Sequence, residues 1–270
     1  MLLSRLDIPA HESVFIRQSL SQGIRLDGRN PNQCREVEIS CNRGEQSSRC
    51  EVSMGNTKVL CTVFGEIVAP YLDRPNDGII QFNAALSVGA ENSDLEKAEI
   101  IRLLEKSIRE SEAIDTESLC VLSGERVWLI TCDVRVLDYD GNVIDASVLA
   151  TMGALRAFRK PEVSVILAGL GGNGEQQQAN QIVVHSTDDR EPLPLALHHS
   201  PLAVSFAIFS DIGPTQSPFQ NKDKDKDKDG EHNGNSGREF VQKQTLLVVD
   251  PTKSEEACMD GSVTFSTCLC

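Results

Sequence analysis

The chain has 270 residues, with 26 Lys or Arg against 40 Asp or Glu, which gives a formal net charge of −14 at pH 7. Hydrophobic residues make up 40% of it, enough for one sizeable core, and this excludes a chain that is disordered throughout. The negative charge excludes a protein that coats nucleic acid with its overall field, because phosphate binding depends on Lys and Arg. A small basic patch is still compatible with RNA binding.

The nine cysteines show neither the spacing of a zinc knuckle nor a CxxC pair, so we expect reduced thiols in an intracellular protein. Arg5 and Asp7 interrupt the apolar start of the chain, which therefore lacks the core of a signal peptide. No later run approaches the roughly 18 apolar residues of a membrane span. The sequence thus predicts a soluble protein without a membrane partner.

The first predicted elements are a helix and a strand meander. Residues 11–22 carry apolar side chains at helical offsets and end at Gly23, a good residue for a left-handed C-cap. From Cys34 onward the period changes to two, and Gly55-Asn56 between two strand-like runs predicts a hairpin. Residues 81–88 are a further strand candidate.

In the middle of the chain, helices and strands alternate. Residues 93–111 repeat apolar side chains every three or four positions, which predicts an amphipathic helix. Residues 125–139 form a β-branched run that contains the only tryptophan, Trp128, as a core residue. Asp145 is the expected N-cap of a helix over residues 146–159. Short strands are expected near residues 163–167, 182–185, 203–209 and 246–250. This order predicts an α+β fold with helices packed on one side of a mixed sheet.

Two segments have few apolar side chains that could pack into a core. Residues 169–180 are rich in Gly and Gln, as is typical of a flexible loop. Residues 211–239 contain the repeat KDKDKDKD followed by Gly, Asn and Ser, so we expect a disordered insertion between two strands. The repeat is electrically neutral and gives no reason for nucleic-acid binding.

A series of short motifs runs through the chain in a fixed order. It begins with R-x-D-G-R at Arg25 to Arg29 and with Arg74-Pro75-Asn76-Asp77-Gly78, and it continues at residues 102–109, 114–120, 127–128, 140–147, 158–161, 250–252 and 255–261. Taken together, the series resembles the RNase PH superfamily, and more closely one ring subunit of the RNA exosome. The first motif alone would be weak, whereas the ordered series is specific.

The resemblance covers about residues 12–267 and implies an RNase PH-like fold, a two-layer α/β unit of the ribosomal S5 domain 2 kind. It divides the chain into an N-terminal helix and opening motif (1–28), an RNase PH-like domain (29–210), the Lys/Asp-rich insertion (211–239) and the final strands of the domain (240–270). Members of the superfamily usually continue past the final strand. We therefore expect a chain that ends at Cys270 to be a truncated product with an incomplete closing layer.

The partners implied by the resemblance are other RNase PH-like exosome ring subunits, paired head to tail, S1/KH-type cap subunits, and RNA threaded through the ring. The same resemblance implies a location in the nucleus, the nucleolus and the cytoplasm. It also implies a role in 3′–5′ RNA degradation and processing, including rRNA maturation and mRNA turnover.

Phosphorolysis needs cationic groups and backbone amides that hold inorganic phosphate, and acidic groups that place a metal or share a proton. Active members of the superfamily hold phosphate with a Gly-Thr/Ser-Arg turn, and here Ile144 stands in the position of the arginine. A neutral branched side chain cannot bind phosphate in this way. Active members also carry two acids six positions apart, where this chain has Glu256 and Ser262. We therefore expect no catalytic residue, no metal and no cofactor, and a structural role in the ring.

Two alternatives stay open. Asp250 and Asp260 are close in sequence and could hold a divalent metal. One alternative is therefore an active phosphate-dependent 3′–5′ exoribonuclease that uses Asp250, Glu256 and Asp260. Release of nucleoside diphosphates by the purified chain would favour this alternative. The other is a nonfunctional truncated isoform, which would be poorly soluble and would fail to co-purify with a ring.

Arg102, Lys106 and Arg109 fall at i, i+4 and i+7, so the predicted helix presents three positive charges on one face. By spacing alone, a solvated face paired with nearby glutamates is the more common outcome. The resemblance implies instead that these three residues and Arg74 lie toward the channel or a neighbouring subunit. There they would contact RNA phosphates without reading sequence.

Overall fold

The computed structural model describes residues 8–86, 93–166, 180–187, 189–210 and 245–269. The predicted flexible loop, apart from Asn180, and the predicted insertion at residues 211–239 therefore lie outside the described residues. Within the described part, no helix is long and apolar enough to cross a membrane.

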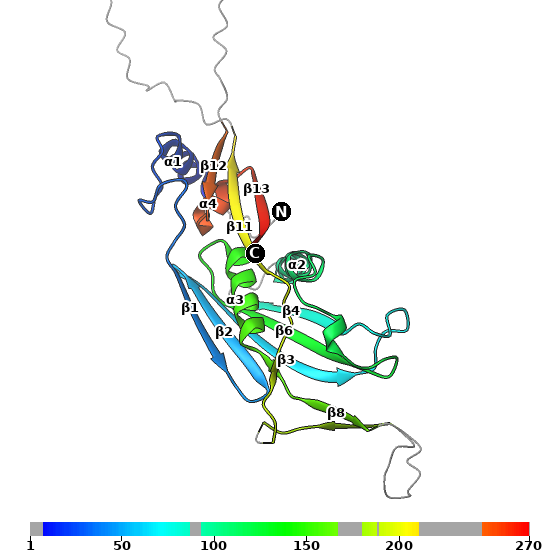
Figure 1. Cartoon of the computed structure of the whole chain (residues 1–270). Coiled ribbons are helices and arrows are strands. Elements are labelled where there is room, and N and C mark those ends of the chain that lie inside the picture. Colours follow the sequence, from blue (N-terminus) through cyan, green and yellow to red (C-terminus); the bar gives the residue numbers. More distant parts are fainter. Residues whose placement is uncertain (1–7, 87–92, 167–179, 188, 211–244, 270) are drawn as a thin grey trace, which may run out of the picture.

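The larger layer is a six-stranded mixed sheet (Figure 1). Its strands run in the order β1-β2-β3-β6-β4, and the short β5 also pairs with β6. Every pairing is antiparallel except that of β4 with β6, which is parallel. The bounds are β1 Val37–Arg43, β2 Ser47–Met54, β3 Thr57–Val68, β4 Ile79–Leu86, β5 Cys120–Leu122 and β6 Arg126–Asp138. The mixed sheet, the Gly55-Asn56 hairpin and the buried Trp128 confirm the predictions.

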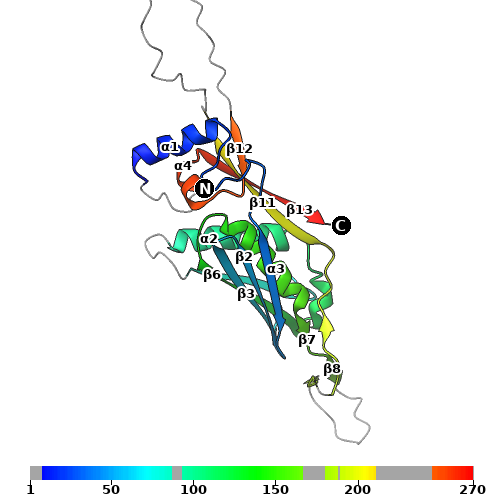
Figure 2. The ribbon, with the colours of Figure 1, turned by 90° about the vertical axis from the view of Figure 1, so that its left-hand side faces the viewer.

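Helix α3 (Val143–Ala157) covers one face of this sheet, and α2 (Ser93–Leu104) lies beside it (Figure 2). Alternate residues of β2 and β3 are fully buried against these helices, among them Val52, Val59 and Val63. The prediction that Asp145 caps α3 is wrong, because the helix begins earlier and Asn142 is its N-cap. Asp145 lies in the first turn instead.

The helix predicted over residues 93–111 changes type part-way. After α2 ends at Leu104, residues Glu105–Arg109 form a π-helical turn. Because a π turn holds more residues than an α turn, it shifts the angular position of every side chain that follows. The assumed α-helical offsets of Lys106 and Arg109 therefore do not apply.

A smaller layer packs on the other side of α3. It contains the antiparallel sheet β12-β11-β13 together with α1 and α4 (Figure 1). The bounds are α1 Ala10–Ser21, β11 Ser200–Phe209, β12 Leu246–Val249, α4 Lys253–Cys258 and β13 Gly261–Leu269. Its core consists of Ile16, Leu20, Ala207, Phe209, Val248 and Cys258. The N-terminal helix, β11 and β12 match the predicted elements, whereas α4 and β13 were not predicted.

Short elements complete the fold. The 3₁₀ turn Glu117–Leu119 precedes β5, and β7 (Arg159–Lys160) pairs with β10 (Leu193–Pro194). Strands β8 (Val163–Ile166) and β9 (Gln181–Val184) form a hairpin that projects from the body of the molecule (Figure 1).

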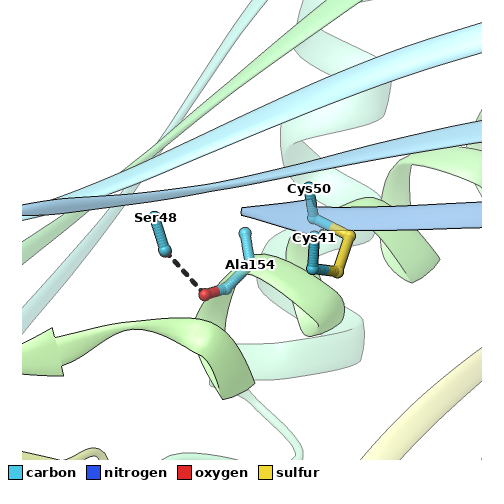
Figure 3. Close-up of a disulfide and its surroundings, with 4 residues drawn as sticks. All are labelled: Cys41, Ser48, Cys50 and Ala154. Carbon is cyan, nitrogen blue, oxygen red and sulfur yellow. Dashed lines mark hydrogen bonds between the residues drawn. A yellow bond between two sulfur atoms is a disulfide. The ribbon is translucent and has the colours of Figure 1, made fainter. Parts of the chain in front are cut away.

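The expectation that all thiols are reduced is wrong for one pair. Cys41 on β1 lies directly opposite Cys50 on β2, and a disulfide joins them (Figure 3). A spacing of nine residues is no recognised motif, so the pairing becomes visible only once the register of the β1–β2 hairpin is known. The other described cysteines are free, and Cys132 is buried in the core.

Candidate functional site

The candidate site lies at the start of α3, where the turn Asp140–Asn142 packs against residues 250–253. Gly141 and Asn142 both have positive φ, at 87° and 54°. A Cβ on Gly141 would lie 2.5 Å from the Pro251 carbonyl oxygen and 2.6 Å from the Lys253 nitrogen. Only glycine therefore allows this close contact between two backbone segments.

We predict that Gly141→Ala lowers the free energy of unfolding by about 2–3 kcal/mol, through a strained φ and a clash with backbone atoms that cannot rotate away. Urea denaturation measures the change. The control is Gly124→Ala, since Gly124 also has a positive φ of 75° but open space around its Cβ position. A loss no larger than that of the control would show that the contact with residues 251–253 is loose.

Arginines of the R-x-D-G-R motif fix the opening segment to the same place. Arg25 is buried and donates to both carboxylate oxygens of Glu255, at 2.9 and 2.6 Å, and to the backbone carbonyls of Val249 and Asp250. Arg29 donates to Asp250 Oδ2 at 2.8 Å. Among the described contacts these two guanidinium groups therefore bind the chain itself, which is a structural role.

Asp250 is the centre of this network. Its carboxylate accepts hydrogen bonds from Arg35 at 2.7 and 2.9 Å, from Arg29 and from the Asn142 side chain at 2.8 Å. Burial opposes its ionisation, but the hydrogen bonds from Arg35 and Asn142 outweigh burial and lower the pKa of Asp250 to about 2. Its oxygens are thus already engaged by cations and amides of the same chain.

Glu256 occupies the N-terminus of α3. The Asn142 backbone N–H donates to its Oε1 at 2.7 Å, and the Tyr139 hydroxyl donates to its Oε2. Backbone amides at a helix N-terminus are a natural anion-binding site. Here the anion comes from α4 of the same chain. Burial raises the pKa of Glu256 to about 7 in spite of these hydrogen bonds.

Asp145, in the first turn of α3, adds a buried carboxylate to the same helix start. It accepts from the Asn142 side chain at 2.8 Å and from the Ser205 backbone N–H and hydroxyl at 2.9 and 2.8 Å. Burial raises the pKa of Asp145 to about 6. The neighbourhood of the helix start is therefore rich in negative charge.

A small cavity opens beside these groups. Its volume is about 30 Å³, and its lining includes Ile144, Glu256 and Ser262, so it has room for about two water molecules. These three residues are the ones that the sequence placed at the positions of the missing arginine and of the two acids. The structure brings them together although Ile144 lies far from the other two in the sequence.

Asp260 lies apart from this cavity. Its carboxylate pairs with Arg17 at 2.5 Å and accepts from Ser210, and hydrogen bonding from Arg17 lowers the pKa of Asp260 to about 2. No group of three or more His, Cys, Asp or Glu side chains in the described part of the chain is arranged to hold a metal ion. Asp250 and Glu256 are hydrogen-bonded to the same residue, Asn142, whereas Asp260 pairs with Arg17 elsewhere.

The predicted RNA contacts divide into two groups. Arg74 and Arg109 line one cleft of about 450 Å³, together with Tyr71, Gln81 and Glu105. Arg102 and Lys106 are exposed but do not line it. Arg109 pairs with Glu105 at 3.0 Å, as the solvated-face interpretation predicts for one of the three cations. Tyr71, 62% exposed, was missed by the sequence reasoning, although it lies three residues before Arg74.

Comparison with known proteins identifies relatives of this chain. Residues 33–161 match the family model "3′ exoribonuclease family, domain 1", RNase PH. The chain is 36% identical over 266 residues to Exosome complex component RRP45 of Saccharomyces cerevisiae, covering 96% of this chain and 76% of the relative. The chain belongs to the RNase PH family. The resemblance drawn from the sequence motifs is confirmed.

Other matches agree with membership of the RNase PH family. Exosome complex component RRP45 of Homo sapiens is also 36% identical, over 93% of this chain but 48% of its own length. A chain of the Archaeoglobus fulgidus exosome, solved with RNA bound to the active site, superposes with a TM-score of 0.66 at 26% identity, covering 95% of this chain and 82% of that one. The predicted RNase PH-like α/β fold is therefore confirmed.

The RNase PH family model ends at residue 161. It includes the main sheet and α3 with Ile144, but not Asp250, Glu256 or Ser262. The residue that fills the start of α3, Glu256, thus comes from the smaller layer, outside the residues that the family model matches.

Proposed function

We propose that this chain is a noncatalytic, structural subunit of the RNA exosome core ring, which supports 3′–5′ RNA degradation and processing by completing the ring and lining the RNA path. Its partners are other RNase PH-like ring subunits, S1/KH-type cap subunits and RNA. In support, RRP45 relatives carry the name of exosome components, and archaeal exosome core chains share the fold.

One observation carries the noncatalytic part of the proposal. The amide at the start of α3 is bound by the carboxylate of Glu256, and the adjoining cavity is lined by Ile144 and Ser262 in place of an arginine and an acid. A phosphate ion placed there would meet the side chains of two acidic residues, Glu99 and Glu256, and no cation among the described residues that line the cavity. The position that should hold phosphate therefore offers carboxyl groups, which repel phosphate once they are ionised, and no cation from its lining.

The RNA path is proposed to follow Arg74, Arg102, Lys106 and Arg109. Arg74 has a side chain that is 71% exposed, so it can reach a phosphate. Tyr71 in the same cleft offers an aromatic face beside the two arginines. Arg102 and Lys106 are exposed on the same helical segment as Arg109 and add two more cations to the proposed path.

The double variant Arg74→Ala/Arg109→Ala is expected to weaken binding of single-stranded RNA to the assembled ring about tenfold at low salt. Removal of each cation that binds a phosphate should also reduce the slope of log affinity against log salt by roughly 0.7. Fluorescence anisotropy across a salt series measures both. Arg43→Ala, at the exposed end of β1, is the control; an equal effect of that control would contradict a specific path through the cleft.

The ring assignment is tested by pull-down of the tagged full-length chain from a eukaryotic lysate, followed by identification of the bound proteins. We expect RNase PH-like and S1/KH-type exosome subunits in stoichiometric amounts. Recovery of none of them would contradict the proposal. The proposed compartments, the nucleus, the nucleolus and the cytoplasm, are checked by imaging the same tagged chain in cells.

A further inference from the structure

The disulfide between Cys41 and Cys50 ties an exposed edge strand to the interior of the sheet. All seven residues of β1 are exposed, and β1 lies at the end of the sheet order. Its neighbour β2 lies between β1 and β3, and Cys50 on it is fully buried. The bond therefore joins one accessible cysteine to one inaccessible cysteine.

The Cys41–Cys50 disulfide packs against helix α3 (Figure 3). Gly153 lies in the interior of α3, where glycine is unfavourable relative to alanine. A Cβ at this position would lie 2.5 Å from Cys50 Sγ and 3.1 Å from Cys41 Sγ. One residue further on, the Ala154 carbonyl accepts a hydrogen bond from the Ser48 hydroxyl at 2.7 Å. The sulfurs and Ser48 together hold the β1–β2 hairpin against α3.

Two buried free thiols, Cys61 and Cys132, contrast with this pair. Burial raises the pKa of Cys61 to about 12 and that of Cys132 well above its usual value, so both are protonated and shielded from reagents. Cys41 is an exposed residue on an edge strand, whereas Cys50 is fully buried on an interior strand, so of the two residues Cys41 is the one that a small thiolate can reach. Geometry thus selects Cys41 as the site of attack and Cys50 as the leaving group.

We propose that Cys41 and Cys50 form a reversible thiol–disulfide site, whose co-reactant is a low-molecular-weight thiol and whose state sets how firmly β1 is held to the fold. A thiolate RS⁻ attacks Cys41 Sγ, which breaks the Cys41–Cys50 bond, forms a mixed disulfide on Cys41 and releases the Cys50 thiolate, which takes up a proton. A second RSH attacks the mixed disulfide and releases RSSR and the Cys41 thiol. Two thiols are oxidised to one RSSR and the protein disulfide is reduced to two thiols.

The consequence for the fold is local. Once the bond is reduced, β1 is held by its backbone ladder to β2 and by packing on α3 alone. An edge strand with seven exposed residues then opens more often than the interior strands. We expect amide hydrogen exchange in β1 to become about tenfold faster on reduction, with exchange in β3 and β6 unchanged.

The test equilibrates the folded full-length chain with mixtures of reduced and oxidised glutathione, traps free thiols with N-ethylmaleimide, and maps the peptides by mass spectrometry. The Cys41–Cys50 linkage should form and disappear reversibly with the glutathione ratio, and the β1 exchange rate should follow it. Cys41→Ser should fix β1 in the fast-exchanging state at every ratio. Cys34→Ser, which removes an exposed thiol outside the pair, should leave the titration unchanged.

Two outcomes would overturn the proposal. One is that Cys41 and Cys50 are both alkylated even in excess oxidised glutathione, so that no bond forms. The other is that the bond persists in excess reduced glutathione while the chain stays folded. Both are measured on the wild-type chain, so they hold even where Cys41→Ser fails to fold.

Discussion

Replacing Arg25 by alanine is expected to lower the free energy of unfolding by about 3–5 kcal/mol. The Arg25 and Glu255 side chains are 0% and 2% exposed, and their paired hydrogen bonds satisfy both carboxylate oxygens. Removing one partner of a buried ion pair leaves the other charge buried without compensation, and this penalty, more than the missing attraction, sets the size of the effect. Urea denaturation followed by circular dichroism measures it.

The control for this prediction is Arg17→Ala. Arg17 also forms an ion pair, with Asp260, but the two side chains are 34% and 37% exposed, so the expected loss is at most about 1 kcal/mol. The double variant Arg25→Met/Glu255→Leu should recover part of the loss, because it removes both charges. If Arg25→Ala costs no more than Arg17→Ala, the R-x-D-G-R segment is not anchored as described.

Replacing Glu256 by glutamine is expected to change how stability depends on pH. Burial raises the pKa of Glu256 from 4.5 to about 7 in the folded state. Between these values the folded chain keeps a proton that the unfolded chain has lost, so the free energy of unfolding falls as pH rises from about 4.5 to about 7. At about 1.4 kcal/mol per pKa unit, the fall amounts to up to about 3 kcal/mol.

Glutamine cannot ionise and still offers an oxygen to the Asn142 N–H. In the Glu256→Gln variant, the free energy of unfolding should therefore not fall with pH on account of residue 256. Relative to wild type, the variant should gain up to about 3 kcal/mol between about pH 4.5 and about pH 8. The pKa of Asp145 is also raised, from 3.8 to about 6. It lowers the free energy of unfolding with rising pH equally in wild type and variant, so its effect cancels when the two proteins are compared. Glu110→Gln, the same exchange at an exposed residue, shows what losing one carboxylate does by itself. A difference that stays flat across the range would mean that Glu256 is not held at the helix start.

Elements with strong periodicity were predictable from the sequence. The alternation around Gly55-Asn56 reflects burial of one face of the hairpin. The β-branched run at residues 125–139 and the Ala-rich stretch of α3 reflect elements that are buried on more than one side. Helix α4 was not predictable because six residues cannot show a helical period, and the π turn at Glu105–Arg109 was hidden because its residues are ordinary helix formers.

The candidate site was predictable in part. Counting positions against the family motifs identified Ile144, Glu256 and Ser262, and the structure places all three on one cavity. The sequence could not reveal that Glu256 binds the Asn142 amide, because this contact joins residues 114 positions apart. Nor could it separate Arg109, which lies in the cleft with Arg74, from Arg102 and Lys106, since the helical spacing of the three cations does not record the π turn between Glu105 and Arg109.

The most direct test of the central claim is phosphate-dependent release of nucleoside diphosphates from the 3′ end of a labelled RNA, measured with the purified full-length chain across a range of phosphate and magnesium concentrations. With Glu256 filling the start of α3 and Ile144 in place of an arginine, we predict no release above that of RNA incubated without protein. Release that rises with phosphate and is abolished by Asp250→Asn would contradict the account and would identify an active exoribonuclease.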